Sequence, residues 1–154
     1  MPVVEQKGEA MTQQASKELM DMIYQALASE LQGSIQYMWH HIATPKEEGS
    51  EARKLFRKIA MAEMEHAEEI AEAFRKLGGE LPTQPDPPVI VGKTIKEMIE
   101  MDIRAEEGAL ELYPRIAETA KKEGLSKIQG IFEDILSDEK EHYKSYTKLL
   151  EKLG

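Results

Sequence analysis

Apolar side chains recur along this chain at the spacing of a buried helix face. In four long segments they return every three or four residues, which is typical of an α-helix that buries one side and exposes the other. Most Gly and Pro residues fall between these segments, where they interrupt the pattern. The pattern predicts helices over residues 12–43, 48–77, 94–122 and 125–153.

The connections between these helices indicate how they are arranged. Short turns join the first helix to the second and the third to the fourth, so each pair should form an antiparallel hairpin. The stretch from Gly78 to Lys93 is rich in Pro and long enough to return along the bundle as an extended crossover. We therefore predict an all-α fold, an antiparallel four-helix bundle over residues 12–154, preceded by a flexible N-terminal tail at residues 1–11.

The two predicted hairpins repeat each other. A displacement of 76 residues places Tyr37 on Tyr113 and Phe56 on Phe132. Two copies are too few to form a capped solenoid, so the repeat predicts two related hairpins that face each other.

The composition excludes several classes of protein. The chain has no cysteine, which rules out disulfide scaffolds, thiol catalysis, iron–sulfur clusters and thiolate zinc sites. Its 29 acidic and 20 basic side chains give a formal net charge of −9, which disfavours binding to nucleic acid. No apolar run approaches the roughly 20 residues that cross a bilayer, and the start of the chain lacks a signal-peptide pattern. We expect a cytoplasmic protein that binds neither nucleic acid nor membrane.

Six Glu and His residues interrupt the apolar stripes at equivalent places in the two halves. The first and third helices each carry one Glu, and the second and fourth each carry a Glu-x-x-His pair. Because all six lie in the stripes, they should point into the bundle, where buried carboxylates need counter-charge. No Lys or Arg lies beside them in the stripes, which leaves metal ions to supply it. The six are Glu30, Glu63, His66, Glu106, Glu139 and His142.

The residue types and their spacing point to a pair of metal ions. Glu and His at i and i+3 lie one turn apart on the same helix face, so one helix can supply both donors. We assign Glu63 and Glu139 as bridging carboxylates, and the two His and the two remaining Glu as terminal ligands. Four carboxylates balance two divalent ions, and this mixture of oxygen and nitrogen donors suits iron or manganese. A lone Glu-x-x-His would carry little weight, whereas its repetition argues against coincidence.

With these residues the sequence resembles the ferritin-like superfamily, and most closely its bacterioferritin branch. The four Glu follow one another at steps of 33, 43 and 33 residues, and segments such as ELQGSIQYMWHH, EMEHAEEI and DEKEHYKSY extend the likeness over about residues 15–150. The resemblance implies a ferritin-like bundle with its long crossover between the second and third helices. It also implies a ferroxidase that oxidises Fe(II) with O2 or H2O2, for iron storage or protection against oxidative stress. The six residues would be its catalytic and metal-binding residues and would hold two Fe ions per subunit, with Mn as the alternative.

The same resemblance implies a haem and an assembly. Met64 matches the methionine that ligates haem between two bacterioferritin subunits, so the resemblance allows a haem b site there, with a place in the core or an interface as the alternative role of Met64. A homo-oligomer built from dimers into a shell is expected. Only twelve residues follow His142, so the family's short fifth helix should be missing, and a dimer, a twelve-subunit shell and a 24-subunit cage stay open. Ala62 stands where bacterioferritins often carry an acid beside a pore, whereas its repeat partner is Asp138. Any external electron donor would be another protein.

Two other functions stay open. A peroxidase or manganese-catalase-like oxidoreductase would use the same ligands on H2O2. A non-enzymatic helical interaction module would use the inward Glu and His only as a hydrogen-bonded polar layer.

Nearby Tyr and His residues have smaller predicted roles. Tyr37 and Tyr113 are candidates for hydrogen bonding near the site or for electron donation, with packing the favoured role of Tyr113. His40 and His41 are expected at the surface or as partners of carbonyls at the helix end.

Overall fold

The computed structural model describes residues 14–154, so the predicted tail at residues 1–11 lies outside the described residues. Four helices follow one another, and the described range contains no strand. None of these helices in residues 14–154 is long and apolar enough to cross a membrane. The predicted all-α, four-helix fold is confirmed. The helices are α2 (Lys17–Ala43), α3 (Lys46–Lys76), α4 (Ile95–Lys122) and α5 (Ser126–Leu153).

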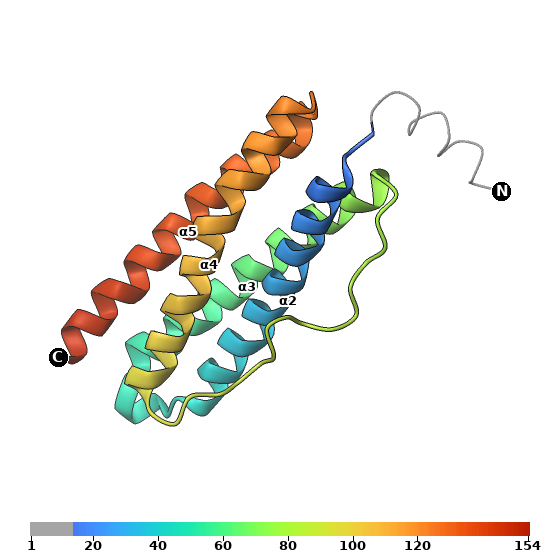
Figure 1. The fold of residues 1–154 in the computed structure, drawn as a ribbon. Coiled ribbons are helices and arrows are strands. Elements are labelled where there is room, and N and C mark those ends of the chain that lie inside the picture. The colour runs from blue at the N-terminus through green and yellow to red at the C-terminus, as the bar shows by residue number, and fades with distance from the viewer. Residues whose placement is uncertain (1–13) are drawn as a thin grey trace.

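The helices form two antiparallel hairpins that face each other (Figure 1). Helix α2 packs along α3, and α4 packs along α5, while α2 also contacts α4 and α3 contacts α5. After α3 the chain returns along α2 to the opposite end of the bundle, where α4 begins (Figure 1). The Asp86 N–H donates a hydrogen bond of 3.2 Å to the Ala28 carbonyl and so ties this crossover to α2.

Capping residues explain why the observed helix starts differ from the predicted ones. The Ser16 hydroxyl accepts a hydrogen bond of 3.1 Å from the Leu19 N–H, so it caps α2, and the predicted start at residue 12 is too early. Thr94 caps α4 in the same way. Near the start of α3, Gly49 leaves the helical conformation (φ −156°, ψ 54°), so a first turn leads through a kink into the regular helix. All four helices end within one residue of the prediction.

Two apolar clusters fill the bundle on either side of a polar layer. Burial of a large apolar side chain contributes about 1.5–3 kcal/mol to folding, so these clusters hold the four helices together. The polar layer lies between the clusters and its position is set by them. Large buried members of one cluster are Leu19, Ile70, Ile116 and Phe132, and of the other Phe56, Ile59, Ile99 and Tyr146.

Candidate metal centre

The polar layer brings together all six residues that the sequence analysis selected. Two overlapping groups of four have ligand atoms within 4.8 Å of one another. Glu63 and Glu139 belong to both groups, as the predicted bridging carboxylates would. Five of the six residues are buried, and the side chain of His142 is 14% exposed. The groups are Glu30, Glu63, His66 and Glu139, and Glu63, Glu106, Glu139 and His142.

Both imidazoles turn their Nδ1 atoms toward the carboxylates. His66 Nδ1 lies 3.1 Å from Glu63 Oε2 and 3.4 Å from Glu30 Oε1. His142 Nδ1 lies 2.8 Å from Glu139 Oε1. The two rings stack with their centroids 5.9 Å apart. The two halves of the layer therefore follow the internal repeat.

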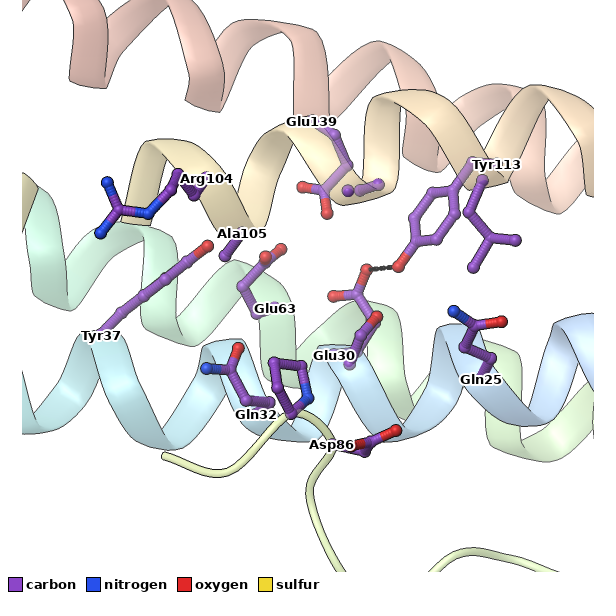
Figure 2. Close-up of a pocket in the computed structure, with 15 residues that line it drawn as sticks. Gln25, Glu30, Gln32, Tyr37, Glu63, Asp86, Arg104, Ala105, Tyr113 and Glu139 are labelled. Atoms are coloured by element: carbon purple, nitrogen blue, oxygen red, sulfur yellow. Dashed lines mark hydrogen bonds between the residues drawn. The ribbon is translucent and has the colours of Figure 1, made fainter. Parts of the chain in front are cut away.

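Two tyrosines hold carboxylates of the opposite hairpin. Tyr37 on α2 donates a hydrogen bond of 2.7 Å to Glu106 on α4. Tyr113 on α4 likewise donates a hydrogen bond to Glu30 on α2, so each hairpin holds one carboxylate of the other (Figure 2). Burial raises the pKa of both phenols well above its usual value, so both stay protonated and donate. Tyr113 also packs against Phe132 at 5.3 Å between centroids, so it combines the expected packing role with a hydrogen bond.

Burial and crowding of charge control protonation in the layer. Burial raises the pKa of Glu63 and Glu139 well above the usual value, and repulsion by neighbouring carboxylates adds to the effect. Burial alone would lower the pKa of His66. The close contact and charge of Glu30, together with Glu139 and Asp138, outweigh burial and raise that pKa to about 9. Without cations the layer therefore retains protons.

Several buried carboxylate oxygens and an imidazole nitrogen of the layer form no hydrogen bond within residues 14–154. A buried polar atom without a partner costs about 1–3 kcal/mol, so four of them in one place would be unfavourable if nothing else were bound. Carboxylate oxygens and imidazole nitrogens are the donors that iron and manganese accept. The residues present therefore fit a pair of such ions. The atoms are Glu30 Oε1 and Glu106 Oε1, together with Glu139 Oε1 and His142 Nδ1, which lie 2.8 Å apart but do not form a hydrogen bond.

A cavity of about 270 Å³ reaches the layer between α2 and α4. Glu63 and Glu139 of the polar layer line it, as does Asp86 of the crossover (Figure 2). Arg104 and Gly108 of α4 also line it. One water molecule occupies about 30 Å³ in the liquid, so the cavity has room for several molecules of that size. O2 and H2O2 are small enough to enter it.

A second opening lies on the α3–α5 side. This groove, of about 820 Å³, is lined by His66 and by acidic residues including Glu65, Glu69 and Asp138. Asp138 Oδ2 lies 2.9 Å from His66 Nε2, a contact that the sequence analysis did not predict. The only feature of the sequence that pointed to this contact was the position of Asp138 directly before Glu139. His66 therefore stands between the buried layer and an acidic surface groove.

The expectation of a surface position or a carbonyl partner is wrong for His40. This residue is fully buried, with Nδ1 3.0 Å from Asp102 Oδ2, and Nε2 accepts a hydrogen bond of 3.0 Å from the Gly92 N–H. The crossover and α4 cover this part of α2, which the helical pattern alone did not reveal. His41 does pair with a carbonyl, that of Arg53, at 2.8 Å.

Met64 lies on the outer side of α3, apart from the polar layer. It is 49% exposed. It borders a largely apolar groove of about 450 Å³ together with Leu27, Leu31 and Leu81. A thioether exposed beside an apolar groove can serve as an axial ligand to a haem that covers the groove.

A four-helix bundle with Glu from two helices and Glu-x-x-His from the other two defines the class of ferritin-like di-metal carboxylate proteins. The family described as "Ferritin-like domain" matches residues 20–154, and the chain belongs to this family. It is 30% identical over 131 residues to a bacterioferritin of Desulfovibrio desulfuricans, covering 85% of this chain and 73% of that protein. It is 32% identical over 126 residues to a rubrerythrin of Porphyromonas gingivalis, covering 81% of this chain but only 62% of the rubrerythrin.

Solved structures of bacterioferritins have the same fold. That of Mycobacterium tuberculosis matches with a TM-score of 0.84 and 25% identity over 91% of this chain and 88% of its own. The structure of the Rhodobacter capsulatus bacterioferritin is described with a metal-free dinuclear site and a heme iron. It matches with a TM-score of 0.82 and 26% identity, covering 92% of this chain and 90% of its own. The structure of the D. desulfuricans bacterioferritin is described with its diiron site in different catalytic states. It matches with a TM-score of 0.81 and 27% identity, covering 95% of this chain and 82% of its own. The fold is thus that of a bacterioferritin-like di-iron protein, as the sequence analysis predicted.

Proposed function

We propose that the protein is a ferroxidase that takes up two Fe(II) ions as substrate and oxidises them with O2 or H2O2. The observation that carries the proposal is the convergence of four buried carboxylates and two imidazoles in two overlapping ligand groups, in which four polar atoms make no hydrogen bond within residues 14–154. Each Fe(II) gives up one electron, and the pair supplies the two electrons that reduce O2 to H2O2 or H2O2 to water. The residues proposed to bind the ions are Glu30, Glu63, His66, Glu106, Glu139 and His142.

The side chains of the layer have distinct proposed roles. Glu63 and Glu139 bridge the two ions, because each belongs to both ligand groups. The imidazoles and the remaining two Glu each bind one ion, and the tyrosine hydroxyls hold those two Glu in place. The cavity between α2 and α4 admits the oxidant. The acidic groove beside His66 attracts Fe(II) to the opposite side of the layer.

Substitution of the ligands tests the proposal. We expect Glu63→Ala and His142→Ala to abolish rapid Fe(II) oxidation, followed by stopped-flow absorbance of the ferric product, with an unchanged helical circular dichroism spectrum. Glu118→Ala is the matched control, because this Glu is exposed and remote from the layer. Wild-type oxidation rates in both ligand variants would contradict the proposal.

The likeness to a rubrerythrin supports a second candidate, an oxidoreductase that uses the same ligands on H2O2 with iron or manganese. Turnover of H2O2 by the Fe-loaded and Mn-loaded protein, compared with the rate of Fe(II) oxidation by O2, separates the two. Elemental analysis tests the remaining alternative. Fewer than one metal ion per chain under iron-replete conditions would favour a helical interaction module.

We also propose a homo-oligomer built on dimers, with haem b held at Met64. The exposed thioether and its apolar groove support this, and the R. capsulatus bacterioferritin is described with its heme iron in a special position, that is, on a symmetry element of that crystal. Expression with added haem should yield a Soret band that Met64→Leu removes. Met61→Leu, also exposed on α3, should retain it. A colourless wild-type protein would exclude the haem, and analytical ultracentrifugation would give the subunit number.

A further inference from the structure

The two imidazoles of the metal centre differ in what holds their outer nitrogen. His66 Nε2 lies 2.9 Å from Asp138 Oδ2. Within residues 14–154, every carboxylate within 4.0 Å of His142 faces its inner atom, Nδ1, and none faces Nε2. The internal repeat accounts for the difference, because the position equivalent to Asp138 is Ala62, 76 residues earlier, and a methyl group cannot accept a hydrogen bond.

The contact with Asp138 fixes how the His66 ring is oriented. When Nε2–H donates to the Asp138 carboxylate, the opposite ring atom, Nδ1, faces Glu30 and Glu63. The contact also makes the imidazole a stronger donor to a cation. Within the described residues His142 lacks such a carboxylate at Nε2, so its ring must be oriented when the ion binds.

The position of Asp138 suits this role. Its side chain is 60% exposed on the α3–α5 groove, whereas that of His66 is 7% exposed. The contact therefore spans the boundary between the groove and the buried layer, and it joins α5 to α3. Asp138 also directly precedes Glu139, so the same turn of α5 positions a bridging carboxylate and the partner of a terminal imidazole.

We propose that Asp138 is a positioning residue that makes the two metal positions unequal. The position formed with Glu30 and His66 binds its ion more tightly and fills first. The position formed with Glu106 and His142 fills second and exchanges its ion more readily. This inference rests on the proposed function, because it takes the six residues as metal ligands.

Anaerobic titration of the metal-free protein with Co(II) tests the inference without turnover, since bound Co(II) is visible in its absorption spectrum. The wild type should bind two ions in two separate steps. Carboxylate partners of ligating His typically contribute roughly 10–100-fold in metal affinity. Asp138→Ala should therefore weaken the first step by roughly that factor and merge the two steps. Asp138→Asn should restore part of the difference, because its amide oxygen still accepts the hydrogen bond.

A second pair of variants reverses the asymmetry. Ala62→Asp should tighten the second step, and the exchange Ala62→Asp with Asp138→Ala should make the His142 position fill first. Anomalous diffraction from crystals grown with one Co(II) per chain would locate the first ion. Asp134→Ala is the charge control, since it removes an exposed carboxylate one turn earlier on α5 and should leave both steps unchanged.

The results separate this inference from the proposed function. Two equal steps in the wild type, an equal loss in Asp134→Ala and Asp138→Ala, or an exchange variant that still fills the His66 position first would each overturn the role of Asp138. Retention of both Co(II) ions in Glu63→Ala would instead overturn the metal centre itself.

Discussion

The hydroxyl of Tyr37 on α2 donates a hydrogen bond of 2.7 Å to Glu106 on α4, so a residue of the first hairpin orients a proposed ligand of the second. The contact places one carboxylate oxygen of Glu106, Oε2, on the phenol. The other, Oε1, has no hydrogen-bond partner in the described part of the chain. Oε1 therefore has no hydrogen bond to give up when it binds an ion.

Removal of this hydroxyl should weaken the ion position that includes Glu106. A hydrogen bond to a charged group contributes about 1.5–3 kcal/mol, so we expect Tyr37→Phe to lower Co(II) affinity there by about ten- to a hundredfold. Tyr146→Phe is the control, because the hydroxyl of Tyr146 is also buried but has no hydrogen-bond partner among residues 14–154. Equal affinities in the two variants would show that the Tyr37 hydrogen bond does not support metal binding.

The metal-free protein should lose stability as the pH rises. Folding raises the pKa of Glu63 and Glu139 above 4.5 and that of His66 from 6.5 to about 9. A raised pKa contributes stability that is fully present below the unfolded value and is lost as the pH rises through the folded value. The loss should therefore begin above pH 4.5 and continue toward pH 9.

Thermal melting with a chelator and with Mn(II) would measure this effect. Bound cations favour the deprotonated carboxylates, so the gain in Tm on adding Mn(II) should grow with pH. Glu63→Gln removes one of the titrating groups and should flatten the pH dependence of the metal-free protein. A Tm of the metal-free wild type that rises across the interval would contradict the assignment.

His40 should matter to stability far more than its neighbour in sequence. His40→Ala leaves Oδ2 of the buried Asp102 carboxylate and the N–H of Gly92 without their partner, although Gln36 still donates to Oδ1. Loss of one member of a buried pair costs about 3–5 kcal/mol, whereas His41→Ala removes one hydrogen bond to a carbonyl and should cost about 1 kcal/mol. Urea unfolding at one protein concentration would compare the two free energies. Similar losses for both would rule out the buried network as a stabilising element.

Gly108 offers a way to obstruct the cavity between α2 and α4. A Cβ atom at this position meets nothing within 4 Å, and Leu is a better helix former than Gly by about 1 kcal/mol. We expect Gly108→Leu to fold and bind Co(II) normally while slowing Fe(II) oxidation by O2 several-fold. Gly130→Leu is the control, since this position on α5 is equally open and lies outside the cavity. An unchanged rate in Gly108→Leu would mean that the oxidant enters elsewhere.

Periodicity was sufficient to place Glu30 and Glu106 in the interior, because an inward position in a helix is defined by spacing along the chain. The displacement of 76 residues then related the two hairpins and paired each predicted ligand with its counterpart. The helix ends followed from local signals. The predicted start of α2 was too early, because the residues directly before Ser16 include no Gly or Pro that would mark a break.

Which residues lie opposite one another was decided only by the tertiary structure. His40 and Asp102 are 62 residues apart, and His66 and Asp138 are 72 residues apart. Spacing along one helix shows which side faces inward, but it does not show which side of the neighbouring helix meets it or where the crossover runs. The sequence alone therefore determined four helices, their repeat and the set of inward Glu and His. The packing of α5 on α3 and of the crossover on α2 assigned their partners, because those contacts depend on helix rotation and offset.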